Sequence, residues 1–439
     1  MTVERLSAAN TAVPYDRTGP PTIVHLGVGA FARAHLAVYA DDLLRAGHPA
    51  MVRGVSLRSR RAEEQLGPQD GLFTVDQREP GQDPELRVIG ALASVGTGVE
   101  AAIAAIAAPT TALVTLTVTE KGYESDEVPG VIAHGLDRRR GTGPPPVIAS
   151  LDNVMDNGAV LRQRVLEATG KFDAGLSRWI MEHVAFPSSV VDRMVPATTP
   201  ADLDAIAERL GHRDEAAVVA EQHRSWFLAE VDGLPPLADV GVQVVGDVGP
   251  YQWRKLWLLN GPHSALAYGG LLAGCETIAD AAGHPVVAPF VRRLVDDVLE
   301  VAQRSPGIET TAFAADSLRR FANPELGHTC RQVGADGSRK LVQRLLPVIT
   351  ARAQLGLPTD RLAVAVAIWL AAMSGLRPQG VALPELDDPD AATLRTATDR
   401  RAATGTVLGA HVTPELGDQL EVILERLQRQ GIDVLREAT

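Results

Sequence analysis

A pair of glycines placed directly after a short apolar run constrains the first half of this 439-residue chain more than any other feature. The run 22–26 is typical of a buried strand, and Gly27-x-Gly29-x-x-Ala32 separates it from a helical pattern that continues to residue 44. In such a turn the first glycine permits the tight bend, the second lets a pyrophosphate approach the backbone, and the third small residue lets the helix pack on the sheet. The motif predicts that Gly27, Gly29, Ala30 and Phe31 contact a dinucleotide, with a plain strand–helix turn as the alternative.

The end of the next expected strand bears on the choice of cofactor. An acid that binds the adenosine ribose is expected there, about 20 residues beyond the glycines. The strand 51–57 is followed instead by Arg58-Ser-Arg-Arg61, and the first acid is Glu63. An arginine such as Arg58 suits a 2′-phosphate, although a solvated basic turn explains the same residues. We therefore expect NAD(H) as the cofactor and leave NADP(H) open.

Strands and helices alternate up to about residue 245. Further strands are expected at 112–118 and 147–149, and helices at 101–108 and 160–169. Such alternation indicates a parallel sheet with helices on both faces. Helical periodicity dominates the remainder. The expected fold is α/β: a Rossmann-type parallel-sheet domain over residues 1–248, whose first 20 residues form a loose arm, and a mostly α-helical domain over residues 249–439.

Charge and composition exclude several function classes. The formal net charge is −12, and a chain this acidic, without a basic cluster, is not expected to bind nucleic acid or an anionic membrane. The two cysteines and the histidines have no metal-ligand spacing, so no metal site is expected. The first residues contain no apolar run of the signal-peptide type, which favours a cytoplasmic location.

Lys255, Asn260 and His263 lie within nine residues of an otherwise apolar segment. On an ideal helix, at about 100° per residue, they fall within an arc of roughly 140°. Oxidation of an alcohol requires a base for the hydroxyl proton, and a lysine serves near neutrality only if its pKa falls from ~10.4 to roughly 7–8. A neutral amide such as that of Asn260 suits the developing alkoxide. A surface lysine beside a helix-capping asparagine is the alternative that spacing leaves open.

Six motifs, in order between about residues 20 and 380, give the chain a family resemblance. They are Val24–His35, Leu116–Tyr123, Ser150–Gly158, Phe186–Pro196, Lys255-x4-Asn260-x2-His263 and Asp336–Lys340. In these motifs the chain resembles the long-chain mannitol dehydrogenases and fructuronate reductases (mannonate oxidoreductases). The resemblance implies a metal-independent NAD(P)-dependent oxidoreductase. Such an enzyme interconverts an open-chain polyol or sugar acid and its keto sugar, of the mannitol/fructose or mannonate/fructuronate type.

The resemblance also implies roles for single residues. Lys255 would be the general acid/base, Asn153 and Asn260 the oxyanion hole, and His263 the group that orients the substrate. Thr117 and Glu120 would contact the cofactor. The residues implied to bind substrate are Lys340, Asp192 and, where mannitol enzymes can carry an arginine, Gln332 with the adjacent Arg331.

The sequence leaves two other functions open. One is a polyol phosphate dehydrogenase of the mannitol-1-phosphate type. The other is a non-catalytic protein that senses a sugar or nucleotide on the same fold, against which the complete lysine–asparagine–histidine set argues.

Overall fold

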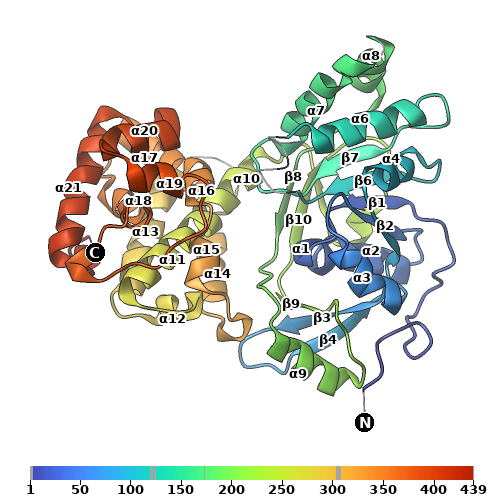
Figure 1. The fold of residues 1–439 in the computed structure, drawn as a ribbon, viewed down its shortest axis with the longest axis horizontal. Coiled ribbons are helices and arrows are strands. Elements are labelled where there is room, and N and C mark those ends of the chain that lie inside the picture. Colours follow the sequence, from blue (N-terminus) through green and yellow to red (C-terminus); the bar gives the residue numbers. More distant parts are fainter. Residues whose placement is uncertain (1–2, 119–121, 123–124, 173, 303–307, 439) are drawn as a thin grey trace. The chain divides into compact units, whose positions relative to one another are not determined.

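The computed structural model describes residues 3–118, 122, 125–172, 174–302 and 308–438 (Figure 1). The chain divides into two compact units, Met1–Gly249 (unit 1) and Pro250–Thr439 (unit 2). Within the described ranges, no helix is both long enough and apolar enough to cross a lipid bilayer.

Unit 1 is built around a five-stranded parallel sheet of order β5-β2-β1-β6-β7 (Figure 1). Its strands are β1 (Ile23–Leu26), β2 (Val52–Ser56), β5 (Leu92–Thr97), β6 (Leu113–Leu116) and β7 (Val147–Ser150). The helices that follow these strands or lie between them are α1 (Ala30–Ala34), α2 (Leu36–Arg45), α3 (Arg61–Leu66), α4 (Val99–Ala107), α6 (Glu127–Arg139), α7 (Asn157–Ala168) and α8 (Ala174–His183).

Successive residues of β1 are buried in two different apolar clusters. Ile23 belongs to the cluster that contains α2, and Val24 to the one that contains α4, α6, α7 and α8. Because side chains alternate across a strand, the two clusters cover opposite faces of the sheet. The expected parallel sheet with helices on both faces is confirmed.

Two smaller sheets complete unit 1, and neither was predicted. One has the order β4-β3-β9 and the other β11-β10-β8. Their strands are β3 (Phe73–Arg78), β4 (Glu85–Ile89), β8 (Ser189–Asp192), β9 (Val218–Glu221), β10 (Ser225–Ala229) and β11 (Gln243–Val245), with α9 (Pro200–Leu210) between β8 and β9. β3 pairs in parallel with β9, which is more than a hundred residues away in sequence (Val75 opposite Val218), so local periodicity carries no signal for this pairing.

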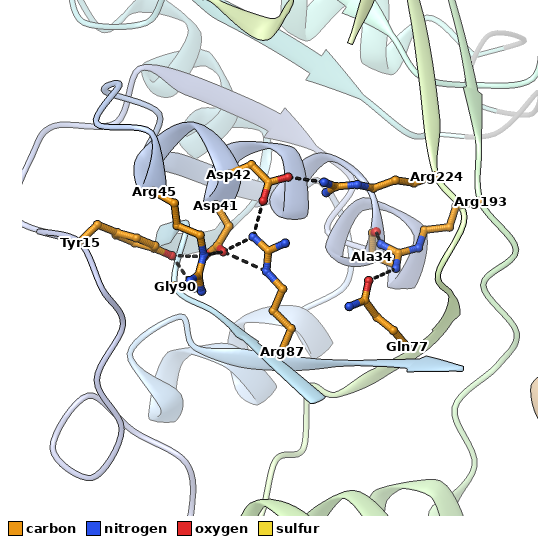
Figure 2. Close-up of polar contacts among 10 residues, drawn as sticks. All are labelled: Tyr15, Ala34, Asp41, Asp42, Arg45, Gln77, Arg87, Gly90, Arg193 and Arg224. Atoms are coloured by element: carbon orange, nitrogen blue, oxygen red, sulfur yellow. Dashed lines mark hydrogen bonds and ion pairs between the residues drawn. The ribbon is translucent and has the colours of Figure 1, made fainter. Parts of the chain in front are cut away.

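The N-terminal arm, expected to be loose, is packed on unit 1. Leu6 is fully buried, and its backbone N–H donates to the carbonyl of Arg213 at 2.9 Å. Further along the arm, the Tyr15 hydroxyl donates to the buried carboxylate of Asp41, which also accepts hydrogen bonds from Arg45 and Arg87 (Figure 2). The arm therefore anchors α2 through a buried charge.

The Asp41 carboxylate is expected to contribute strongly to stability. Burial raises its pKa, but hydrogen bonds from Arg45, Tyr15 and Arg87 outweigh burial and lower the pKa overall. Since the folded-state pKa lies below the unfolded value, this stabilisation is complete above pH ~3.9 and is lost as the pH falls through the folded-state pKa. Asp41→Asn should lower the free energy of unfolding by about 3–5 kcal/mol.

Urea denaturation at neutral pH measures this effect. Glu100→Gln is the matched control, because it removes a carboxylate whose pair with Arg138 is exposed, and it should leave the unfolding midpoint unchanged. An equal shift of the unfolding midpoint in both variants would show that the burial of Asp41 does not increase its contribution to stability.

Unit 2 is helical, and no strand occurs among its described residues (Figure 1). Two of its helices, α11 and α18, are almost wholly buried and form its centre. Its helices are α10 (Gly249–Lys255, which begins at the unit boundary), α11 (Gly261–Ala273), α12 (Ile278–Gly283), α13 (Val287–Ala302), α14 (Thr311–Phe321), α15 (Cys330–Gly334), α16 (Gly337–Arg344), α17 (Leu346–Gln354), α18 (Asp360–Met373), α19 (Ala391–Thr396), α20 (Arg400–Leu408), α21 (Pro414–Gln430) and α22 (Asp433–Glu437).

Candidate functional site

The two glycines of the turn after β1 have different structural roles. Gly27 has a φ of 97°, and a Cβ there would lie 2.2 Å from the carbonyl oxygen of Thr117. Gly29 has an ordinary φ of −81°, and a Cβ on it would meet no other atom within 4 Å. Gly27 is therefore required by the fold, whereas Gly29 leaves space beside the backbone.

A buried histidine fixes the turn. The Nε2 atom of His25 lies 3.1 Å from the carbonyl oxygen of Gly27 and 3.0 Å from Oγ1 of Thr117, and Nδ1 lies 2.8 Å from Oγ1 of Thr115. Burial lowers the pKa of His25 to about 4, so the ring is neutral at physiological pH. This network joins the end of β1 to the end of β6.

A pocket of about 500 Å³ opens beside this turn. Residues of the turn, of the segment from the end of β2 into α3, and of the segment 197–217 line it, together with Arg33 and Thr117. The contribution of segment 197–217 was not predicted, since it depends on the pairing of β9 with a distant strand.

Some of the predicted cofactor residues line this pocket and others do not. Gly27, Gly29, Ala30 and Thr117 line it. Phe31 stacks on His35, with ring centroids 5.1 Å apart, and is not among the lining residues. The side chain of Arg58 is exposed and forms an ion pair with Glu127 at 2.5 Å; of the arginines that follow β2, Arg61 lines the pocket. The remaining candidate, Glu120, lies outside the described residues.

Arg33 brings a partly buried positive charge to the pocket. Its Nη1 donates to the carbonyl of Ala216 at 2.5 Å and its Nε to that of Gly29 at 3.4 Å. Burial lowers the pKa of Arg33 to about 10, so it remains protonated at neutral pH. Because its hydrogen-bond acceptors are neutral carbonyls, an anion in the pocket would gain a charge-assisted partner.

The lysine segment of unit 2 is a continuous helical stretch with a wide turn in its middle. α10 ends at Lys255, a π turn spans Leu256–Asn260, and α11 begins at Gly261. A π turn has i→i+5 hydrogen bonds and is frequent at functional sites. The arc of roughly 140° expected for an ideal helix therefore does not apply. Pro262 lies in the first turn of α11, where a missing N–H costs no helical hydrogen bond.

The three predicted catalytic side chains of this segment are buried. Lys255, Asn260 and His263 are 6%, 8% and 7% exposed, which excludes a surface lysine. Oδ1 of Asn260 and Nε2 of His263 are buried and have no hydrogen-bond partner among the described residues. A buried polar atom without a partner is costly, so both atoms are suited to a hydroxyl group of a ligand.

His263 is held in an aromatic and cationic environment. Its ring stacks on Phe321, with centroids 4.8 Å apart, and meets the edge of His328 at 5.2 Å. Its pKa is lowered well below the usual value, first by burial and then by His328, Arg344, Lys340 and Arg320. The imidazole is therefore neutral at physiological pH and acts as a hydrogen-bonding group.

The cations around His263 come from two helices. Arg320 is on α14 and is buried, whereas Lys340 and Arg344 lie one turn apart on α16. Arg344 donates from Nη1 to Oγ of Ser264 at 3.0 Å and to the carbonyl of Asn260 at 3.4 Å, so it fixes the start of α11. Nζ of Lys340 donates to the carbonyl of Val333 at 3.2 Å. These charges favour an anionic ligand next to His263.

The remaining predicted site residues belong to both units. In unit 1, Asn153 is exposed in the loop after β7. Asp192, at the end of β8, is buried with Oδ2 at 3.6 Å from Nε2 of His223. In unit 2, Arg331 and Gln332 are exposed, and Gln332 completes the N-terminal capping box of α15 with Thr329. No group of three or more potential metal ligands occurs in the part of the chain that the structure describes.

Comparisons with known proteins match both units. The model of the mannitol dehydrogenase Rossmann domain matches residues 21–237, and that of the mannitol dehydrogenase C-terminal domain matches residues 247–420. D-mannonate oxidoreductase of Escherichia coli (strain K12) is 37% identical over 83% of this chain and 82% of its own. Mannitol 2-dehydrogenase of Pyrenophora tritici-repentis is 33% identical over 97% of this chain and 83% of its own.

Solved structures give a similar result. Mannitol 2-dehydrogenase of Pseudomonas fluorescens, in a ternary complex with NAD and D-mannitol, superimposes with a TM-score of 0.88 at 31% identity, over 100% of this chain and 97% of that one. A D-sorbitol dehydrogenase in substrate-free form matches with a TM-score of 0.81 at 26% identity, over 96% of each chain.

Proposed function

Since the chain belongs to the mannitol dehydrogenase family, we propose that it is an NAD(P)-dependent oxidoreductase that interconverts an open-chain sugar acid and its keto acid, of the mannonate/fructuronate type. The observation that carries this proposal is the buried set of Lys255, Asn260 and His263 with cations beside it. The Escherichia coli relative is named for mannonate, which agrees with an anionic substrate.

The pocket of unit 1 fits the diphosphate of a nicotinamide dinucleotide. The backbone of residues 27–30 would hold the pyrophosphate in the space beside Gly29, and Arg33 would neutralise its charge. Thr117, at the end of β6, is a further contact candidate. When bound, the cofactor supplies the hydride acceptor for the carbinol carbon.

The two glycines predict different defects when a side chain is added. Gly29→Val should weaken NADH binding by about tenfold or more, because its side chain fills the space beside the turn, while thermal stability is retained. Gly27→Ala should lower the free energy of unfolding by about 2–4 kcal/mol, because of its positive φ and the contact with Thr117. NADH fluorescence titration and thermal unfolding measure the two effects. The same phenotype in both variants would contradict this division.

In unit 2, Lys255 is the residue that transfers the proton. In oxidation its neutral amine accepts the proton of the substrate hydroxyl, and in reduction its ammonium returns a proton to the carbonyl oxygen. The side chains of Asn260 and His263 hydrogen-bond the reacting oxygen and a neighbouring hydroxyl. Asn153 remains a predicted donor to the same oxygen, and Asp192 a predicted substrate contact.

The substrate carboxylate is assigned to Lys340, with Arg320 and Arg344 adding positive potential. Nζ of Lys340 donates to the carbonyl of Val333 at 3.2 Å, and an ammonium can donate three hydrogen bonds in all. Arg344 is engaged with Asn260 and Ser264, so its primary part is structural. Gln332 and Arg331, which are exposed, remain predicted substrate contacts.

The neutral imidazole of His263 predicts a particular pH dependence. The pKa of His263 is lowered by burial and nearby cations, so the ring stays uncharged as the pH rises from about 6 to about 9. The rate of oxidation should then rise with pH and the rate of reduction should fall, because Lys255 is the group whose protonation changes. His263→Gln should lower kcat/KM by about 10–100-fold, the loss of one hydrogen bond, without moving the midpoint. If the midpoint of the pH–rate profile moved in this variant, the imidazole of His263 would be the group that transfers the proton.

A kinetic screen with NADH and NAD tests the proposal. Fructuronate and mannonate should be turned over with higher kcat/KM than fructose and mannitol. The neutral pair is the second candidate, favoured by the likeness to the Pseudomonas enzyme named for mannitol. Preference for mannitol 1-phosphate would assign a polyol phosphate dehydrogenase. No turnover of any member of the panel would indicate a sensing protein.

A further inference from the structure

We infer that the pocket of unit 1 accepts the 2′-phosphate of NADP(H), with the Arg61 guanidinium as its cationic partner. This inference rests on the proposed function, since it concerns the adenosine end of the same cofactor. In a Rossmann unit the adenosine ribose lies at the carboxyl end of the second strand. Here that strand is β2, which ends at Ser56, and Ser56, Ser59, Arg61 and Gln65 all line the pocket.

The arginines after β2 are not equivalent. Arg58 forms an ion pair with Glu127 at 2.5 Å, and Arg60 lies 3.8 Å from Glu63. The guanidinium of Arg61, in contrast, has no hydrogen bond or ion pair among the described residues, and it lines the pocket. Its charge also lowers the pKa of Arg33, after the larger effect of burial. Two cations, one at each end of the bound adenosine diphosphate, therefore act on the same pocket.

No carboxylate from the end of β2 lines the pocket. Glu63, the first acid after the strand, accepts a hydrogen bond from Oγ1 of Thr97 at 2.7 Å and is not a lining residue. The acid that lines the pocket is Glu215, from the segment before β9, and its carboxylate is paired with Arg213. A ribose with free 2′- and 3′-hydroxyls would therefore lack its usual acidic partner, and a 2′-phosphate would meet no repelling charge at β2.

Ser59 adds a neutral donor. Its Oγ accepts a hydrogen bond from the backbone N–H of Arg61 at 3.2 Å, which leaves the hydroxyl proton for a phosphate oxygen. Both side chains are exposed, so replacing either should not disturb the fold. The combination of an arginine, a hydroxyl and no acid at this place is the arrangement that favours a 2′-phosphate over a 2′-hydroxyl.

Calorimetric titration of the full-length protein with adenosine 2′,5′-bisphosphate and with adenosine 5′-monophosphate tests the inference without turnover. The bisphosphate should bind about tenfold more tightly, the effect of one charge-assisted contact. Arg61→Ala should remove this difference and leave the affinity for the monophosphate unchanged. Arg58→Ala is the matched control, because its guanidinium is paired outside the pocket, and it should change neither affinity.

The outcomes separate the two claims. If the monophosphate and NADH bind but the bisphosphate binds no more tightly than the monophosphate, the inference fails and the proposed function stands. If Arg58→Ala and Arg61→Ala weaken the bisphosphate equally, the assignment to Arg61 fails. If neither adenosine nucleotide nor NADH binds, the proposed function fails as well. A kcat/KM for NADPH at least equal to that for NADH is the corresponding expectation in the active enzyme.

Discussion

Lys255→Arg is expected to lower kcat for sugar-acid oxidation by about 10³–10⁴-fold, although it keeps a positive charge at the site. A guanidinium remains protonated at every accessible pH and cannot accept the hydroxyl proton. The composition makes this exchange informative, because lysine supplies 4 of the 42 lysine and arginine residues of the chain. Arginine is the more frequent basic residue in this chain. It cannot replace lysine at a position where the side chain must lose a proton.

The affinity for NADH, measured by fluorescence titration, should not change in Lys255→Arg. The neighbouring exchange Arg254→Lys is the matched control. Nη1 of Arg254 donates to the carbonyl of Glu309 at 3.3 Å, and its guanidinium lies 4.4 Å from the ring centre of Phe313. These are packing contacts, so Arg254→Lys should keep most of the turnover. Wild-type kcat in Lys255→Arg would exclude a proton-transfer role.

Lys340→Met is expected to lower kcat/KM for a sugar acid by about 10²-fold while changing that for the corresponding neutral polyol much less. The difference reflects the loss of a charge-assisted hydrogen bond to the carboxylate, worth roughly 1.5–3 kcal/mol. Lys340 contributes to the positive potential at His263, together with Arg344 and Arg320. Steady-state kinetics with mannonate and mannitol in parallel measure this selectivity.

Arg339→Met provides the control for Lys340→Met. Arg339 is the adjacent residue of α16 and is exposed, so its loss should leave both substrates unaffected. An equal fall of kcat/KM for the acid and the polyol in Lys340→Met would mean that Lys340 supports the site without recognising a carboxylate.

The sequence predicted those parts of the molecule that depend on local spacing. The order strand, Gly27-x-Gly29, helix is a local signal, and so is the alternation of strands and helices that predicted the central parallel sheet. The β3–β9 pairing is not local, since Val75 and Val218 meet only after the chain has folded. The contribution of segment 197–217 to the pocket depends on this pairing and was therefore not predicted. The N-terminal arm looked polar, but Tyr15 and Leu6 pack on the unit.

The candidate site shows the same division. Burial of Lys255, Asn260 and His263 agrees with a reactive segment, but the π turn that joins them has no signature in an amphipathic pattern. In the run Arg58–Arg61 the sequence offers three arginines. The ion pair with Glu127, far along the chain, shows that Arg58 is engaged, and the pocket lining shows that Arg61 faces the pocket.

Chemical rescue of Lys255→Ala tests the central claim most directly. The measurement is the single-turnover rate of NADH formation from NAD and mannonate in this variant, with increasing concentrations of a small primary amine. If Lys255 is the proton acceptor, the rate should start near zero and rise in proportion to the concentration of the neutral amine. A variant that forms NADH at the wild-type rate without added amine would contradict the account.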